Sequence, residues 1–190
     1  MKNILIALGV IIVFGLGMIM YANNVYDDAI DYQEEVDKTF GDVQADYQRR
    51  ADLIPGLIAT VKGAAENEKS ILLGVTQARA GIVNAKTPED LEIAGRKINT
   101  AINLAFEAYP QIRSTANFSE FQSQLEGTEN RIGVSRKKYN EAVKIYNAQI
   151  RGKFRKMALG WFADEDDNFV KKEAFNAITK DAEIAPIVEF

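Results

Sequence analysis

An apolar stretch near the N-terminus constrains this chain more than any other feature. Residues Ile4–Ala22 form 19 consecutive positions without a charged or strongly polar side chain. As an α-helix the stretch would be about 28 Å long, close to the ~30 Å hydrocarbon core of a bilayer. A cleaved signal peptide is the alternative, but its apolar region is shorter, and Met20-Tyr21-Ala22 is a poor cleavage site. We therefore expect residues 1–24 to be a transmembrane anchor.

The distribution of basic residues predicts the orientation of this anchor. Lys2 precedes the stretch, whereas the first basic residue after it is Lys38. The positive-inside rule then places the N-terminus in the cytoplasm and the rest of the chain on the other side of the membrane. Because this bias depends on one lysine, the opposite orientation stays open.

The composition excludes several kinds of site. The 190 residues include no cysteine and no histidine, which rules out disulfides and catalysis that depends on either side chain. Zinc sites built on those ligands are also excluded. A net charge of -4 argues against a nucleic-acid partner. The acidic run at 164–167 lacks the spaced ligands and glycine of a calcium loop, so we expect no metal and no cofactor.

The spacing of apolar residues after the anchor predicts long helices. From Val25 to Ile58 the apolar positions recur in steps of four, three and four, which repeats every 11 residues. This period keeps one side of a nearly straight helix apolar. The pattern passes Pro55 without a change of phase and predicts a helix that is kinked there and continues to about Asn84. A break at Pro55-Gly56 is the alternative.

Local signals predict the remaining helices. Thr87 is a suitable N-cap before Pro88, and Tyr109-Pro110 would end a helix near Ala108. Asn117 is expected to cap a third helix of 30 or more residues, whose apolar stripe extends to Phe154. A short amphipathic helix is expected at Phe169–Ile178.

Together these features predict an all-α fold, with an N-terminal transmembrane helix followed by an antiparallel bundle of long helices. We expect the bundle to comprise residues 25–156 and the tail, residues 157–190, to pack on it through its short helix. The charge pattern favours an antiparallel third helix, because the acidic residues 27–46 would then face the basic residues 131–156.

The first candidate cluster lies just before Pro55. Arg49, Arg50 and Asp52 could form a partner or anion site, because arginine presents a rigid fork to carboxylates. We favour a structural interpretation, in which Arg50 pairs with an acid of the bundle such as Glu107 or Glu129.

The second candidate cluster combines bases, asparagines and tyrosines. We expect Asn130, Asn140 and Asn147 to lie beside the apolar stripe and to fix helix register through hydrogen bonds. A nucleic-acid site would also need interleaved bases and aromatic residues, but an anchored acidic chain argues against one. The full set of candidate partner-binding or structural residues is Arg49, Arg50, Asp52, Pro55, Glu107, Tyr109, Glu129, Asn130, Arg131, Arg136, Tyr139, Asn140 and Asn147.

Several segments resemble the LemA family of bacterial membrane proteins. They are YQRRADLIPGLIATVKG (47–63), VTQARA (75–80), EAYPQIRSTANFSEFQSQL (107–125), TENRIGVSRKKYNEAVKIYN (128–147) and the terminal PIVEF. The resemblance implies one N-terminal transmembrane helix, an antiparallel helical bundle and no established enzymatic activity. The chain departs from the family pattern at Gly56, where asparagine is usual, and at Asn67, where histidine is usual.

The resemblance also suggests a role. Family members are often encoded near TPM-domain proteins or membrane metallopeptidases, which implies a scaffold or adaptor of the bacterial envelope. The expected location is the inner (plasma) membrane, as a single-pass protein. The expected partners are the bilayer, further copies of this chain, or other envelope proteins. A regulatory subunit of a membrane protease or hydrolase is the alternative, and a hydrolase using carboxylates is a third hypothesis.

Overall fold

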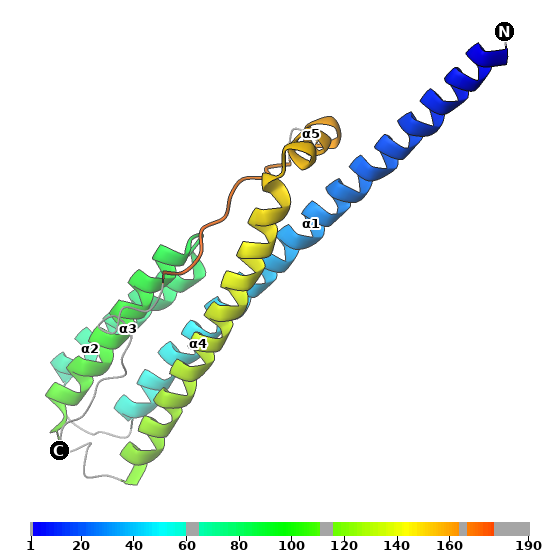
Figure 1. Ribbon diagram of the computed structural model, residues 1–190. Coiled ribbons are helices and arrows are strands. Elements are labelled where there is room, and N and C mark those ends of the chain that lie inside the picture. The colour runs from blue at the N-terminus through cyan, green and yellow to red at the C-terminus, as the bar shows by residue number, and fades with distance from the viewer. Residues whose placement is uncertain (1, 60–64, 111–115, 164–166, 177–190) are drawn as a thin grey trace. The chain divides into compact units, whose positions relative to one another are not determined.

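The computed structural model describes residues 2–59, 65–110, 116–163 and 167–176. Five helices occupy most of these ranges, and the same ranges contain no β-strand (Figure 1). The helices are α1 (Lys2–Ala59), α2 (Ala65–Val83), α3 (Pro88–Ala108), α4 (Ala116–Arg151) and α5 (Lys153–Phe162). The predicted all-α fold is confirmed.

The chain divides into two compact units. Unit 1 comprises Met1–Lys38 and Glu141–Lys172, and unit 2 comprises Thr39–Asn140 and Glu173–Phe190. The two longest helices, α1 and α4, therefore each contribute residues to both units.

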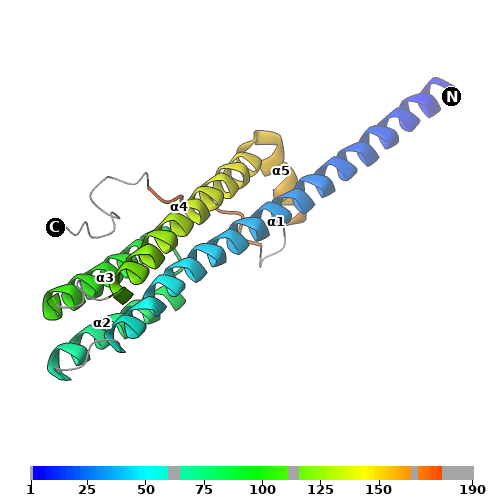
Figure 2. The same cartoon turned by 90° about the horizontal axis from the view of Figure 1, so that it is seen from below.

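In unit 2, α1 and α4 pack against each other in opposite directions (Figure 2). The rings of Phe40 and Tyr139 lie 5.5 Å apart, and Arg50 pairs with Glu129. From the first contact to the second, the residue number rises by ten on α1 and falls by ten on α4, so the two helices are antiparallel. This is the antiparallel arrangement that the charge pattern predicts.

Helices α2 and α3 form an antiparallel hairpin in unit 2 with closely spaced backbones. A Cβ atom on Gly81 would lie 3.4 Å from the Cβ of Ala94, and one on Gly74 would lie 3.8 Å from the Cβ of Ala101. The small residues at these crossings allow the two helices to approach closely. Figure 1 shows the two helices side by side.

The predicted continuation of the first helix to Asn84 is wrong. Helix α1 passes through Pro55, ends at Ala59, and is followed by α2, which returns along it. The amide of Gln44 donates to the carbonyl oxygens of Ile82 and Ala85, each at 3.1 Å, which holds the end of α2 to α1. A helical hairpin and one long helix share the same apolar period, so spacing alone could not separate them.

The predicted bounds of α3 are confirmed because local hydrogen bonds determine them. The Asp90 amide donates to the Thr87 hydroxyl at 3.2 Å, and the Thr87 amide donates to the Asp90 carboxylate at 3.0 Å. This is a capping box, with Pro88 in the first turn. The Lys86 amide, followed by the Thr87 side chain and amide, lowers the pKa of Asp90 below its ordinary value.

Two predicted features of α4 need correction. The helix begins at Ala116, so Asn117 lies in its first turn and is not the cap. The position immediately before Ala116 lies outside the described residues. At the other end α4 stops at Arg151, and Phe154 belongs to α5. The chain adopts an extended conformation at Gly152, which separates the two helices although the apolar spacing continues across it.

The apolar stripe of α1 forms much of the core of unit 2. Val43, Tyr47, Ala51 and Ile54 are all at most 1% exposed. On α3 the buried positions include Leu91, Ile98 and Ile102, as predicted from their helical spacing.

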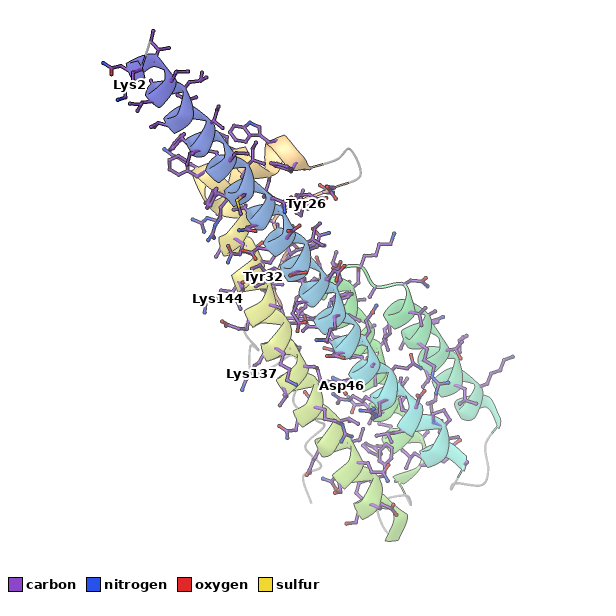
Figure 3. All side chains as sticks on the ribbon, turned by 90° about the vertical axis from the view of Figure 1, so that its right-hand side faces the viewer. Lys2, Tyr26, Tyr32, Asp46, Lys137 and Lys144 are labelled. Carbon is purple, nitrogen blue, oxygen red and sulfur yellow. The ribbon has the colours of Figure 1, made fainter. Side chains whose placement is uncertain are left out.

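In unit 1, the N-terminal turns of α1 expose apolar side chains in every direction. Among the described helices, α1 is long and apolar enough to cross a membrane, and none of its apolar window is buried. Figure 3 shows these side chains around the helix near Lys2. Burial begins at Ala22 and continues through Val25 and Ala29, where unit 1 has neighbouring elements. The apolar stretch is therefore a candidate membrane span.

The predicted helix at Phe169–Ile178 is not present at residues 167–176, and residues 177–178 lie outside the described ranges. Asparagine side chains of α4 bond the main chain at Lys172 and at Phe175. Those main-chain groups are therefore satisfied without a helix. The short helix of the tail region is instead α5.

Candidate functional site

A buried ion pair links α1 and α4 in unit 2. The side chain of Arg50 is 3% exposed and pairs with the carboxylate of Glu129, whose side chain is 23% exposed. The pair that the structural interpretation requires is present, with Glu129 as the acid. Glu107, the other predicted partner, is exposed near the end of α3.

The residues around Arg50 do not form a single cluster. Arg49 points to Asp46 of the same helix, at 3.1 Å, and its side chain is largely exposed. Asp52 accepts a hydrogen bond from Gln48 and pairs with Arg79 of α2. Consecutive helical positions are about 100° apart, so these side chains face different neighbours. Arg50 and Asp52 connect α1 to other helices, and the Arg49 pair stays within α1.

A second set of predicted residues in unit 2 forms hydrogen bonds with the main chain of residues 173–176, which follow α5 in sequence. The amide of Phe175 donates to the side-chain oxygen of Asn140 at 2.8 Å, and the side-chain nitrogen of Asn140 donates to the carbonyl of Phe175 at 3.0 Å. The Tyr139 hydroxyl donates to the carbonyl of Glu173 at 2.9 Å. We name Arg136, Tyr139 and Asn140, with Phe175 between them, the Phe175 clamp.

The ring of Phe175 is the anchor of this clamp. It is 3% exposed and meets the Tyr139 ring edge-on, with centroids 5.2 Å apart. The guanidinium carbon of Arg136 lies 4.7 Å from the centre of the Phe175 ring. Arg136 also donates to Glu92 of α3 at 3.0 Å and to the carbonyl of Asn176 at 3.2 Å. Arg136 thus contacts the Phe175 ring and the main chain of the segment, and its bond to the Glu92 carboxylate holds Arg136 itself in place.

In unit 1, Asn147 makes an equivalent pair of bonds. Its side chain donates to the carbonyl of Lys172 and accepts from the Lys172 amide, each at 2.9 Å. The Lys172 ammonium lies 3.4 Å from the carboxylate of Asp37. The expected role of the asparagines in helix register is therefore wrong for Asn140 and Asn147, which bond an extended segment.

The other candidate residues lie elsewhere. Asn130 and Arg131 are exposed on α4. Asn130 is ten residues from Asn140, a rotation that puts it on a different side of the helix. Tyr109 is 2% exposed and ends α3, its amide donating to the carbonyl of Ala105 at 3.1 Å. Pro55 is half-buried within α1.

Sequence reasoning misses two members of this arrangement, Phe175 and Glu92. The apolar spacing places Phe175 in an amphipathic helix, and Glu92 belongs to no motif. The spacing of Asn140 and Asn147 is a signal that could have found the extended segment. Seven helical residues advance about 10.5 Å, and three extended residues advance about 10 Å. Two asparagines that are seven residues apart on a helix can therefore bond two residues that are three apart in an extended chain.

Tyr146 of α4 is the buried titratable group of unit 1 with the clearest perturbation. Its hydroxyl donates to the side-chain oxygen of Gln33 at 3.2 Å. Burial, followed by the nearby charge of Asp37, raises the pKa of Tyr146 to about 12. The neutral phenol is thus the form that the folded chain favours.

This shift predicts a loss of stability at high pH. Because the folded pKa is raised, the contribution of Tyr146 is complete below pH ~10, the pKa of an unfolded tyrosine, and is lost as pH rises toward ~12. We expect the tyrosinate absorbance of the folded protein to show a last step near pH 12 that Tyr146→Phe removes. A Tyr146 that titrates near pH ~10 in the folded chain would contradict this prediction.

A groove of about 380 Å³ lies between α1 and α4 in unit 2. Its lining residues include the acids Asp52 and Glu120, beside Leu53, Leu57 and Phe121. Asp52 is already paired with Arg79 and holds α1 to α2. Within the described ranges, no three acidic side chains are grouped so that they could hold a metal ion.

The fold and the site define an all-helical protein with an apolar N-terminal helix and a bundle that holds an extended segment of its own chain. The LemA family model matches residues 39–190, so the chain belongs to the LemA family. It is similar to Protein LemA of Metamycoplasma hominis, with 24% identity over 122 residues. The match covers 62% of this chain and 56% of the relative, so the chain spans little more than half of the relative's length.

Proposed function

We propose that this protein is a scaffold or adaptor of the bacterial envelope that is anchored in the inner membrane and acts by binding other polypeptides. The anchor is the apolar stretch Ile4–Ala22, which fits the thickness of a bilayer as one helix. The single lysine before it, Lys2, favours an N-terminus in the cytoplasm and a bundle on the other side.

The observation that carries this proposal is the Phe175 clamp. Asn140 bonds both main-chain groups of Phe175. Main-chain bonds of this kind supply affinity for an extended polypeptide of any sequence, and a pocket for one side chain supplies selectivity. Here the pocket between Arg136 and Tyr139 takes an aromatic ring.

The partner that fits this clamp is an extended segment with an aromatic residue. A second copy of this chain has such a segment, and another envelope protein could supply one. An incoming segment would displace residues 173–176 and regain the bonds that they lose. The exchange therefore costs little beyond the entropy of association.

In-membrane cross-linking tests the proposal. A photoreactive residue would replace Lys137, which is exposed on α4 (Figure 3) and follows Arg136 in sequence. In the variant Phe175→Ala the chain's own anchor is missing, so we expect more cross-links to other polypeptides. Adding Asn140→Ala to Phe175→Ala removes two main-chain bonds, each worth about 1 kcal/mol, from an incoming segment that no longer competes with the chain's own anchor, so we expect at least about a tenfold loss of cross-links relative to Phe175→Ala alone.

The control is Asn130→Ala, which changes an exposed asparagine of the same helix and should leave the yield unchanged. Mass spectrometry of the products distinguishes a second copy from another protein, and recovery of a peptidase would favour a regulatory subunit. Cross-links confined to the chain itself, or equal yields in all variants, would overturn the proposal.

A further inference from the structure

Helix α5 turns its apolar face outward. Phe154, Met157 and Trp161 are 73%, 43% and 57% exposed. Steps of three and four residues place these side chains on one side of the helix. Of the two buried residues of α5, Leu159 lies on the opposite side, and Ala158 borders the exposed side. A helix on a surface that faces only water would present polar side chains outward, so the exposed face of α5 indicates a different environment.

The position of α5 in unit 1 indicates which environment this is. Gly15, Met18 and Ala22 are less exposed than their neighbours in the apolar stretch and lie on one side of α1. Figures 1 and 3 show α5 beside this part of α1, on the N-terminal side of Tyr26. The chain after α5 is tied to Tyr26, whose hydroxyl donates to Asp167 at 2.9 Å and whose ring meets that of Phe169. Helix α5 therefore lies beside the C-terminal turns of the candidate membrane span.

The depth of this contact matches the edge of a bilayer. The residues from Gly15 to Ala22 advance about 10 Å along a helix. Helices that lie in the membrane interface insert their apolar face about 5–10 Å into the boundary between headgroups and acyl chains. If Ala22 is at the end of the hydrocarbon core, α5 is at this boundary.

The charge of α5 fits the same location. Arg151, Lys153, Arg155 and Lys156 follow one another closely, and no acidic residue lies between Glu141 and Asp164. Basic side chains near a bilayer surface are attracted to anionic headgroups, and tryptophan is enriched at the level of the headgroups. Apolar face and basic residues together are what an interfacial helix requires.

We propose that α5 is an interfacial helix that rests on the bilayer crossed by α1, with Phe154, Met157 and Trp161 at the acyl boundary and the neighbouring bases on anionic headgroups. The inference depends on the membrane anchor in the proposed function. It adds a second, lipid-sensitive attachment that would set the orientation of unit 1 at the membrane surface.

Trp161 is the only tryptophan of the chain and reports directly on this contact. The full-length protein would be reconstituted into vesicles of phosphatidylcholine with or without phosphatidylglycerol, using lipids brominated at shallow or deep positions of the acyl chain. We expect a blue-shifted emission, with shallow bromines quenching at least about twofold more strongly than deep ones, as the interfacial depth requires. An unquenched, water-like emission would overturn the inference.

A separate variant tests the contact between the bases of α5 and the anionic headgroups. In Lys153→Gln/Arg155→Gln/Lys156→Gln, we expect the additional quenching caused by phosphatidylglycerol to disappear. The matched variant Lys137→Gln/Lys138→Gln removes exposed bases of α4 and should retain it. Equal quenching with and without phosphatidylglycerol would overturn the role of anionic lipid.

Extraction at alkaline pH separates this inference from the proposed function. A protein that leaves the vesicles has no membrane-spanning anchor, which would defeat both proposals. A protein that stays in the vesicles with an unquenched Trp161 would defeat only the interfacial role of α5.

Discussion

Replacing Arg50 with alanine is expected to lower the free energy of unfolding by about 3 kcal/mol. Removing one member of a buried ion pair leaves the other charge in a poorly solvated place. The residual exposure of Glu129, 23% of its side chain, allows some solvation and keeps the expected cost at the lower end of the usual range. The loss of packing by the buried arginine stem adds to the effect.

Arg49 provides a matched control next to Arg50. Its pair with Asp46 is on the same helix and its side chain is 56% exposed, so Arg49→Ala should cost no more than about 0.5 kcal/mol. Both variants can be compared by urea unfolding of the full-length protein in detergent, followed by helical circular dichroism. The double variant Arg50→Met/Glu129→Met should recover much of the loss, because apolar residues can replace a buried pair. Equal stabilities of Arg49→Ala and Arg50→Ala would contradict the structural role.

Gly95→Ala is expected to destabilise the protein, by about 1–3 kcal/mol, although alanine favours a helix more than glycine does. A Cβ atom at Gly95 would lie 2.6 Å from Cε1 of Tyr47, well inside contact distance. The Tyr47 ring is 1% exposed and packed in the core, so it has little room to move aside. The cost of overpacking then exceeds the gain in helix propensity of about 1 kcal/mol.

Gly41→Ala should have the opposite effect. This glycine is exposed within α1, and a Cβ atom added to it would meet no heavy atom within 4 Å apart from the adjoining backbone of its own helix. We expect the variant to gain up to about 1 kcal/mol from helix propensity alone. Combining Gly95→Ala with Tyr47→Val should recover part of the loss, because the two side chains share one space. A stabilising Gly95→Ala would show that α3 and α1 are further apart than the structure places them.

Local patterns predicted the elements whose ends are set by neighbouring residues. Thr87, Pro88 and Asp90 form a cap within four positions, so the start of α3 followed from the sequence. The apolar stripe correctly identified core residues such as Tyr47 and Ile54. It could not show that the chain reverses after Ala59, because the repeat continues in α2 with a similar period.

The candidate site was predicted only in part. Charge and spacing led to Arg50 and Glu129, because a buried arginine needs an acid and few acids lay within reach. Phe175 was missed because its partners, Arg136 and Asn140, are 35 or more residues away in sequence. An extended segment without a repeat of its own gives no local sign of the side chains that hold it.

The sequence by itself determined the all-helical class, the apolar helix that can span a membrane and the likeness to the LemA family. These properties depend on composition, on the period of apolar residues and on short motifs, all of which can be recognised in the sequence alone. Only the tertiary structure decided that residues 172–176 bond to side chains of α4 and that α5 turns its aromatic side outward. Both outcomes depend on residues that are distant in sequence. Such residues bond the main chain of residues 172–176 and cover one face of α5, and only packing brings them there.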